Sequence, residues 1–360
     1  MNCAIQQITT KFYNVHHHIL LPYFHKKSLY LQRQTDTSRL RKTQFTFHHS
    51  QSISHILPKM KPLLLCLFAL LTIRVAAQDS IHVAFWNMEN YFDTWHDTLK
   101  NDYEFLPEGS YHWTPKRFYA KRNNLYKTIV AMENPIVIGL AEVENDHVLE
   151  ELCQGTPLRK LGFKFVHYES PDKRGVDCAL LYQSSRFKVL ESQPCNMSDS
   201  TEGFFTRDIL LVGGVVDSAD TLFVLVNHWP SQLGGERAAR HRDRISKELD
   251  RLCDSLAAAH PQATIVTMGD FNSQLAQGNG LGSYKYQGVW SWIDNIFLYG
   301  ECRCGETPTK AYQFDWLLTE DKTYMGEKPY RAYLGVRYQG GVSDHLPVWR
   351  SIPIGKTIRP

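Results

Sequence analysis

The feature of this 360-residue sequence that most constrains its fold is a set of strand-length apolar runs that end in polar side chains. A short apolar run followed by a polar turn is typical of a buried strand. Strand ends are rigid positions, so acids, amides and histidines that emerge there can converge on one pocket. Four runs end in Asn87 and Glu89, in Glu142, in His228, and in Asp270 and Asn272; Asp294 lies within a further run, and Asp344 and His345 precede the last one.

Strand and helix patterns mix throughout the chain. One helix is expected from Thr114 and Pro115 to just before Pro135, because Pro is favoured in the first helical turn and stops a helix later. A second is expected over residues 236–259, with Ile245, Leu249, Leu252 and Leu256 inward. Strands are expected over 81–86, 136–141, 176–182 paired with 187–190, 209–216 paired with 222–227, 263–268, 290–298, 314–318 and 346–352. Neighbouring strands with helices between only some of them favour a mixed α/β sandwich.

Residues 60–77 have the features of a secretory signal peptide. A lysine follows Met60, an apolar stretch of about 11 residues comes next, and small residues precede Gln78. The stretch is too short to span a bilayer, which takes about 20 apolar residues. We therefore expect a secreted or periplasmic protein whose mature chain begins at or near Gln78. Residues 1–59 are then expected to be translated upstream sequence, with a basic arm that binds nucleic acid or anionic membrane as the alternative.

Charge and cysteine content describe the remaining body. Residues 1–77 hold ten Lys or Arg and one acid, so residues 78–360 carry 30 basic against 36 acidic side chains. This net charge of −6 lacks the broad basic field of a non-specific DNA-binding protein. A body of 283 residues is large enough for a single domain with one large core. Its six cysteines permit disulfides, and Cys302 and Cys304 favour a disulfide or free thiols over a metal site.

The polar residues at the strand ends are mostly oxygen donors. Carboxylate and amide oxygens suit a hard cation such as Mg²⁺ or Mn²⁺, which keeps several of its waters. The sequence has no Cys/His cluster with zinc spacing and no Gly-rich phosphate loop. Alone, residues 269–272 could form a turn and residues 343–345 a helix cap. All the polar positions in order indicate a metal-dependent active site.

Two of these segments carry a family resemblance. Gly-Asp-Phe-Asn at 269–272, followed by Ser-Asp-His-Leu-Pro-Val at 343–348, resembles the endonuclease/exonuclease/phosphatase family, the DNase I-like metal-dependent phosphoesterases. The resemblance runs from about Ile81 to Ile352. It implies an α/β fold of four layers, two mixed β-sheets flanked by helices, with the active site at one end of the sandwich.

The resemblance also implies a role for each polar position. Asn87 and Glu142 match the residues that hold the metal, with Glu89 as an auxiliary and Asp344 near the ion. The others match residues that contact the phosphate or orient the attacking water: His228, Asp270, Asn272 and His345. The acid that supports His345 is expected to be Asp294, with Asp315 as its rival.

The chemistry of phosphate-ester hydrolysis needs these residue types. A water must attack in line, and charge on the phosphoryl oxygens and the leaving group must be stabilised. A divalent ion and cationic or donor side chains provide that stabilisation. Asp270 can take the proton of the water. His345, held in one tautomer by Asp294, can offset phosphate charge when it is positive.

Other side chains leave alternatives open. Arg174 and Arg207 are loop or strand-start cations that we expect to bind substrate. Three arginines share a face of the second helix, where a solvated surface is expected and a phosphate-attracting rim is the alternative: Arg237, Arg240 and Arg244. Three aromatics could stack on bases, although packing is the default for such residues: Trp113, Tyr284 and Tyr286.

We therefore expect an exported, nuclease-like phosphodiesterase that acts on a phosphate ester such as DNA or RNA. The alternatives are a phosphomonoesterase acting on inositol phosphate, a phospholipase-type enzyme acting on sphingomyelin, and a secreted binding protein with a degenerate site. Retention of every matched position argues against the last. The sequence shows no hydrophobic hairpin suited to stable membrane insertion and no feature of an obligate protein partner.

Overall fold

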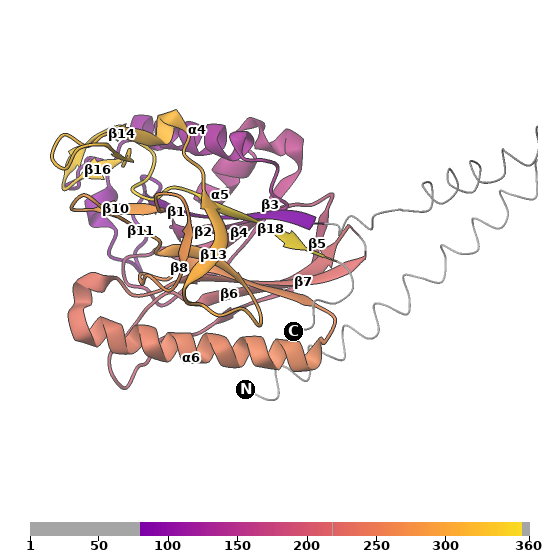
Figure 1. Cartoon of the computed structure of the whole chain (residues 1–360). Helices are drawn as coiled ribbons and strands as arrows, with labels where there is room; N and C mark the ends of the chain where they lie inside the picture. The colour runs from indigo at the N-terminus through magenta and orange to yellow at the C-terminus, as the bar shows by residue number, and fades with distance from the viewer. Residues whose placement is uncertain (1–79, 218, 355–360) are drawn as a thin grey trace, which may run out of the picture. The chain divides into compact units, whose positions relative to one another are not determined.

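Two mixed β-sheets form the centre of the computed structural model (Figure 1). The structure describes residues 80–217 and 219–354, so the expected leader, 1–59 and 60–77, lies outside the described residues. Helices cover the outer face of each sheet. The predicted four-layer α/β sandwich is therefore confirmed.

The seven-stranded sheet has the order β3-β4-β2-β1-β18-β13-β9. Its central strand β1 runs parallel to β2 and antiparallel to β18. The strands are β1 (Ser80–Tyr91), β2 (Val137–Val143), β3 (Phe163–His167), β4 (Asp177–Gln183), β9 (Gln277–Asn279), β13 (Glu306–Ala311) and β18 (Val348–Pro353).

The five-stranded sheet has the order β12-β8-β7-β6-β5. Its strands β7 and β8 are parallel, whereas the other neighbours are antiparallel. The strands are β5 (Phe187–Cys195), β6 (Ile209–Val216), β7 (Asp220–His228), β8 (Thr264–Asp270) and β12 (Asp294–Leu298).

Each sheet contains one parallel pair that is connected through a helix. Helix α4 (Pro115–Ala131) lies between β1 and β2 in the chain, and α6 (Gly235–Ala259) lies between β7 and β8. Figure 1 shows α4 over the outer face of one sheet and α6 over the outer face of the other. Because the carboxyl ends of parallel strands meet at one sheet edge, each pair brings the carboxyl ends of its two strands together.

The alternating side chains of the strands build two hydrophobic layers. In β1, Val83 and Phe85 point into the core between the sheets, whereas Trp86 packs in the layer shared with α4. A Cβ atom on Gly139 of β2 would lie 2.6 Å from Sδ of Met268 in β8. Glycine at this position therefore lets the two sheets approach closely.

The helices follow the predicted apolar faces with one difference. Ile245 and Leu249 of α6 are buried as expected, but Leu252 and Leu256 are only half-buried. Helix α4 begins at Pro115 and ends before Pro135, as predicted. A third helix, α5 (Asp146–Cys153), packs against α4 and β3.

The remaining elements are short. Three two-stranded sheets flank the sandwich: β10 (Tyr284–Tyr286) with β11 (Val289–Ser291), β14 (Leu318–Glu320) with β15 (Glu327–Pro329), and β16 (Tyr333–Leu334) with β17 (Arg337–Tyr338). The 3₁₀-helices are η1 (Tyr103–Phe105), η2 (Pro157–Leu161), η3 (Gln232–Gly234) and η4 (Asp315–Leu317).

One predicted strand pairing is wrong. Strands β4 and β5 follow each other in the chain, but β4 pairs with β2 and β3, whereas β5 pairs with β6. The chain crosses from one sheet to the other at residues 184–186. Phe187 then packs in the core between the sheets with its ring 6.0 Å from that of Tyr182. Burial of this aromatic ring between the sheets explains why the short connection is not a hairpin.

Two predicted strands are divided. Residues 314–318 form η4 and the start of β14, because the rings of Phe314 and Trp316 stack 4.7 Å apart and Nε1 of Trp316 donates to Oγ1 of Thr128. An apolar run of five residues does not separate a strand from a helical turn by its period. The predicted strand 290–298 is likewise interrupted at Trp292 and Ile293, between β11 and β12.

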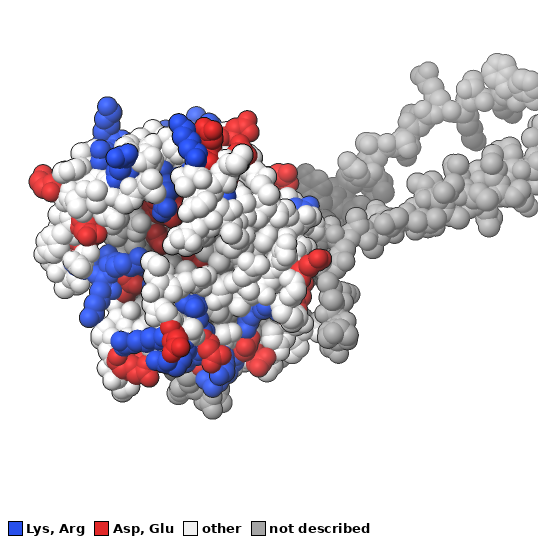
Figure 2. Space-filling view, turned by 60° about the vertical axis from the view of Figure 1, so that its left-hand side comes forward, with Lys and Arg blue, Asp and Glu red and all other residues white. Residues whose placement is uncertain are grey.

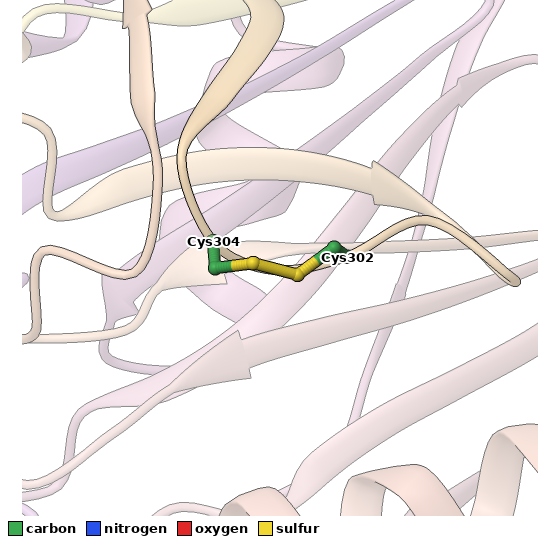
Figure 3. Close-up of a disulfide and its surroundings, with 2 residues drawn as sticks. All are labelled: Cys302 and Cys304. Carbon is green, nitrogen blue, oxygen red and sulfur yellow. A yellow bond between two sulfur atoms is a disulfide. The ribbon is translucent and has the colours of Figure 1, made fainter.

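The cysteines of the described residues take one of the expected forms. Cys302 and Cys304 form a disulfide in the loop before β13 (Figure 3). The other four described cysteines are free thiols: Cys153, Cys178, Cys195 and Cys253. No helix among the described residues is long and apolar enough to cross a membrane.

Candidate active site

Polar residues from both sheets meet at one end of the sandwich. His228 of β7 and Asp294 of β12 are the residues opposite Asp270 of β8 in the strand registers. From the other sheet, Nδ2 of Asn87 donates to Oδ2 of Asp270 at 3.0 Å. The predicted residues are therefore brought together where the two sheets meet.

A cleft of about 990 Å³ opens above this junction. Figure 2 shows a hollow with acidic side chains deep inside and basic side chains around it. Asn87 and Asp294 are buried beneath its surface. The other predicted site residues line the cleft: Glu89, Glu142, Arg174, Arg207, His228, Asp270, Asn272, Asp344 and His345.

Asp270 lies at the centre of the site. Its Oδ1 accepts a hydrogen bond from the backbone N–H of Asn272 at 2.9 Å, and its Oδ2 accepts the bond from Asn87. The side-chain amide of Asn272 in turn donates to the carbonyl oxygen of Trp229 at 2.9 Å. Burial, followed by the nearby Asp294 carboxylate, raises the pKa of Asp270 to about 7. This carboxyl group can therefore gain and release a proton near neutral pH.

His345 and Asp294 form a hydrogen-bonded pair. Nδ1 of His345 lies 2.8 Å from Oδ2 of Asp294, and Nε2 lies 3.9 Å from Oδ2 of Asp270. Burial lowers the pKa of His345, but the Asp294, Asp270 and Asp344 carboxylates outweigh burial and hold the pKa well above its usual value. Asp315, the rival partner, lies exposed in η4. The structure thus places the preferred acid, Asp294, beside His345.

His228 has a different electrostatic environment. Its Nε2 lies 3.8 Å from Oδ2 of Asp270 and 3.8 Å from Oε1 of Glu142. Burial, together with the positive charges of Arg207 and Arg174, lowers the pKa of His228 well below its usual value. The two histidines therefore differ in charge: His345 is held positive, and His228 is held neutral.

The backbone around the cleft adopts an uncommon conformation. Four non-glycine residues have positive φ angles: Glu89 at 48°, Asn90 at 52°, Glu142 at 59° and Asn272 at 47°. Such conformations cost about 1–3 kcal/mol each and cluster at functional sites, where surrounding structure enforces them. The backbone N–H of Asn90 donates to Oε2 of Glu142 at 2.8 Å, which fixes one of the strained residues against another.

The oxygen donors of the β1–β2 edge fit a hard divalent cation. Glu142 has Oε2 bonded to a backbone N–H, and the residue faces the cleft. Burial, and then repulsion by the Asp344 carboxylate, raises the pKa of Glu89 to about 8. A divalent cation would relieve that repulsion, and carboxylate and amide oxygens are the ligands Mg²⁺ prefers.

The metal-ligating side chains around Asp270 are not all arranged to bind one metal ion. One ligand atom from each of Asp270, Asp294 and His345 lies within 4.8 Å of the others. However, the direct hydrogen bond between Asp294 and His345 occupies Nδ1 of the imidazole. These three residues therefore form a contact network, built on the hydrogen bond between His345 and Asp294, beside the oxygen donors.

Two basic residues of the site are absent from the sequence-based prediction. Lys121 of α4 is buried, donates from Nζ to the carbonyl oxygen of Glu89, and has a pKa lowered by burial against the opposing pull of nearby carboxylates. Arg331 donates from Nη2 to Oδ2 of Asp344 at 2.7 Å. Lys121 lies on the apolar face of its helix between Phe118 and Leu125, which is the sequence signal that could have found it.

Glu89 contacts the loop that carries Arg331. Its carboxylate accepts backbone hydrogen bonds from Ala332 at 2.6 Å and Tyr333 at 3.2 Å, and it lies 3.7 Å from Nε of Arg331. The residue thus joins β1 to a segment more than 240 positions later in the chain. Glu89 therefore orients this wall of the site.

The two predicted substrate-binding arginines share an acid. Nη1 of Arg207 donates to Oδ2 of Asp172 at 3.0 Å, and Nη2 donates to the carbonyl oxygen of Trp229 at 2.6 Å. Arg174 lies 3.5 Å from Oδ1 of the same acid, with its side chain 51% exposed. Arg207 is therefore fixed, whereas Arg174 extends along the solvent side of the cleft.

The other arginines and aromatics differ in their positions. Trp113 is only 1% exposed and donates to the carbonyl oxygen of Phe92, so the default of packing is confirmed and the base-stacking alternative is wrong. Its size and the apolar layer around α4 account for its burial. The ring of Tyr284 lies 4.8 Å from that of His345, and Tyr286 is exposed at the cleft.

The arginines of α6 contact the loop before β6. Arg237 donates to the carbonyl oxygen of Glu202, and Arg244 pairs with Asp199 at 2.7 Å. These contacts use both side chains in holding the loop to the helix. Neither these two arginines nor Arg240 lines the cleft described above.

The chain is similar to known proteins in sequence pattern and in structure. The endonuclease/exonuclease/phosphatase family model matches residues 82–278 and 275–353. No curated protein matches the chain significantly. Similar solved structures include truncated TDP2 from Caenorhabditis elegans, with 14% identity, a TM-score of 0.48, and coverage of 76% of this chain and 97% of that chain. A family protein from Bacteroides thetaiotaomicron has 14% identity, a TM-score of 0.44 and the same two coverages.

The family model spans most of the chain and includes the two parallel strand pairs that are connected through helices, the residues at their ends and the final strand. This protein therefore belongs to the endonuclease/exonuclease/phosphatase family.

Proposed function

We propose that the protein is a metal-dependent phosphoesterase that hydrolyses phosphodiester bonds by in-line attack of an activated water. Membership of the family supports a hydrolase that acts on phosphoesters. The observation that carries the proposal is the convergence of Asp270, His228 and the His345–Asp294 pair on one cleft.

Asp270 is suited to accept a proton from the attacking water. Its pKa of about 7 lies close to neutral pH, where a general base is most effective because it is both deprotonated and basic. The hydrogen bonds from Asn87 and from the N–H of Asn272 leave the carboxylate in one orientation. Asp270 therefore combines a fixed position with a suitable proton affinity.

The two histidines are suited to different parts of the phosphate. His345 is held positive by its carboxylate neighbours, so it can stabilise negative charge on the phosphoryl oxygens. His228 is held neutral, so it can donate a single hydrogen bond without adding another full charge. Arg207 and Arg331 both line the cleft and add positive charge to its walls.

A divalent ion bound by Asn87 and Glu142, with Glu89 and Asp344 close by, would stabilise charge on the phosphoryl and leaving-group oxygens. Mg²⁺ and Mn²⁺ suit the oxygen donors best. The residues themselves contribute binding, orientation and proton transfer around that ion.

The substrate is proposed to be a nucleic acid or a similar phosphodiester. Exposed apolar side chains line the cleft beside the polar centre: Phe205, Leu233, Tyr286 and Val289. Aromatic and apolar surfaces of this kind can hold the base or another non-polar part of a substrate.

The experiment is to assay the purified protein against plasmid DNA, RNA, inositol phosphates, sphingomyelin and bis-p-nitrophenyl phosphate, with Mg²⁺ and with EDTA. We expect metal-dependent cleavage of a diester, absent in an Asp270→Asn variant. Release of phosphate only from inositol phosphates would favour the phosphomonoesterase alternative. Binding without turnover of any of these compounds would favour a degenerate binding protein.

We also propose that the protein is exported and that the mature chain starts at or near Gln78. The signal-peptide pattern of residues 60–77 supports this, because a lysine, an apolar stretch and small residues precede Gln78. Mass spectrometry of the native protein tests it. Peptides from residues 1–59 in the mature protein would contradict both the signal peptide and the start-site interpretation.

A further inference from the structure

A second group of metal-ligating side chains lies at the base of the β3–β4 loop, outside the residues lining the catalytic cleft. His167 is the last residue of β3, Asp177 is the first of β4, and Glu169 lies in the loop between them. One ligand atom from each of the three residues lies within 4.8 Å of the other two. The loop is thus closed at its base by three groups that can bind one cation.

Two buried atoms in this group lack hydrogen-bond partners. They are Nε2 of His167 and Oδ2 of Asp177, on side chains that are 2% and 1% exposed. The other polar atoms of these side chains are used: Nδ1 of His167 lies 2.8 Å from Oδ1 of Asp146, and Oδ1 of Asp177 accepts the N–H of Ser170 at 3.0 Å. Leaving two polar atoms unpaired in the interior is costly, so a ligand between them is the expected remedy.

The spacing of these atoms fits a shared ion. Nε2 of His167 and Oδ2 of Asp177 are 3.6 Å apart, beyond the usual hydrogen-bond length. Two ligands at about 2.0–2.1 Å from one tetrahedral ion are separated by about 3.4 Å. The Asp146 carboxylate on Nδ1 also leaves Nε2 free to bind a metal, as a carboxylate partner commonly does for metal-binding histidines.

The local charge also favours a cation. Among the described residues, three carboxylates lie close to His167: those of Asp146, Glu169 and Asp177. Lys100 opposes them with Nζ 3.3 Å from Oε2 of Glu169, but the same ammonium group is also bonded to the carbonyl oxygens of Ser170 and Asp172. Burial lowers the pKa of His167, but the Asp177, Asp146 and Glu169 carboxylates outweigh burial and raise it, so the group attracts positive charge.

We propose that His167, Glu169 and Asp177 bind a second divalent cation that is separate from the active site. One imidazole nitrogen with two carboxylates suits Zn²⁺ or Mn²⁺ better than Mg²⁺, which prefers oxygen ligands and its own waters. This site is independent of the proposed function, because none of its ligands lines the catalytic cleft.

The ion would fix the segment that presents cations to the cleft. The segment between His167 and Asp177 contains Asp172, which holds Arg207, and Arg174, which lines the cleft. Tying its two ends together restricts the positions of both arginines. Occupancy is therefore expected to raise the melting temperature and to lower KM for an anionic substrate without altering the groups that transfer protons.

The test is a zinc titration of the full chain by calorimetry in excess Mg²⁺, with protein-bound zinc counted after dialysis. We expect Asp177→Asn to lose one equivalent of zinc relative to the wild-type chain and Glu169→Gln to weaken binding. Asp146→Asn should weaken it about 10–100-fold, as loss of a residue that orients a ligand does. Asp315→Asn, a change of an exposed aspartate in η4, is the matched control and should retain every equivalent.

Crystals grown with zinc locate the ion directly. A peak at the zinc absorption edge between Nε2 of His167 and Oδ2 of Asp177 is the expected result. Equal zinc counts in wild type, Asp177→Asn and Glu169→Gln, with no such peak, would overturn the proposal and leave a proton shared by His167 and the two aspartates as the occupant. Glu169→Gln keeps the test decisive if Asp177→Asn fails to fold, because Glu169 is half-exposed.

Discussion

The β1–β2 pair and the β7–β8 pair are built in the same way but end in different chemistry. Each is a parallel pair connected through a helix, and each presents its carboxyl ends to the same cleft. The first pair ends in Asn87, Glu89 and Glu142, whereas the second ends in His228 and Asp270. The fold brings the strand ends together at one cleft, and the side chains at those ends determine the chemistry of the cleft.

The difference separates a cation region from a proton region. The β1–β2 end offers oxygen atoms and two acidic residues with positive φ angles, Glu89 and Glu142. The β7–β8 end offers a carboxyl group with a pKa of about 7 and a histidine held neutral, with His345 and Asp294 beside them. The hydrogen bond from Asn87 to Asp270 connects the two regions. Mutations on the two sides should therefore give different kinetic signatures.

The largest effects on activity are expected from mutations in the proton region. Asp270→Asn and His345→Ala should each lower kcat by at least about 10²–10³-fold, since each removes a group that acts on developing charge or on the proton of the water. Steady-state kinetics with saturating Mg²⁺ measures the loss, and circular dichroism checks the fold. A variant with near-normal kcat at saturating metal would remove that residue from the mechanism.

In the cation region, Glu142→Gln should mainly change the concentration of metal that activity requires. We expect the Mg²⁺ concentration for half-maximal activity to rise by more than about tenfold, because a charged ligand is replaced by a neutral one in a site that favours carboxylates. Metal titrations of activity, with EDTA-treated enzyme as the starting point, give this value. If kcat falls at saturating metal while the metal requirement is unchanged, Glu142 belongs with the proton region instead.

The pair formed by His345 and Asp294 should give an intermediate effect. Asp294→Asn should lower kcat about 10-fold to 100-fold, less than His345→Ala, because it disturbs the orientation of the imidazole without removing it. Residues that act as a unit are not additive, so the double variant should be little worse than His345→Ala. Asp315→Asn is the matched control; a damaging Asp315→Asn beside a silent Asp294→Asn would reverse the assignment.

Much of this comparison could be predicted from the sequence. The strand ends, the order of the polar residues and the acid beside His345 follow from local apolar runs and a family resemblance. The apolar helix face marks Lys121 as a buried residue, but its contact with Glu89 and the pairing of β4 could not be predicted in this way, since both join separate segments of the chain. Arg331 likewise reaches the site through a loop without a periodic pattern.

The dependence of activity on pH tests the same division between the cation region and the proton region. Because Asp270 must be deprotonated to accept a proton, kcat/KM should rise with pH, up to tenfold per unit, and level off above its pKa of about 7. It should fall again only at alkaline pH, where His345 loses the proton that its carboxylate neighbours hold. Profiles measured with saturating metal test this, and His345→Ala should lack the alkaline limb. A profile that is flat between pH 5 and 8 would exclude Asp270 as the base.

The smallest effect is expected at the solvent side of the cleft. Arg174 is half-exposed and lies beside Asp172, so its charge is screened by water and partly balanced. Arg174→Gln should therefore raise KM about threefold to tenfold and leave kcat unchanged, because the interaction is the same in the bound substrate and in the transition state. Arg186→Gln, which removes an exposed arginine paired with Asp217, is the matched control and should change neither value. A fall in kcat for Arg174→Gln would show that the guanidinium acts on the reacting phosphate itself, and the solvent side of the cleft would then belong to the catalytic region.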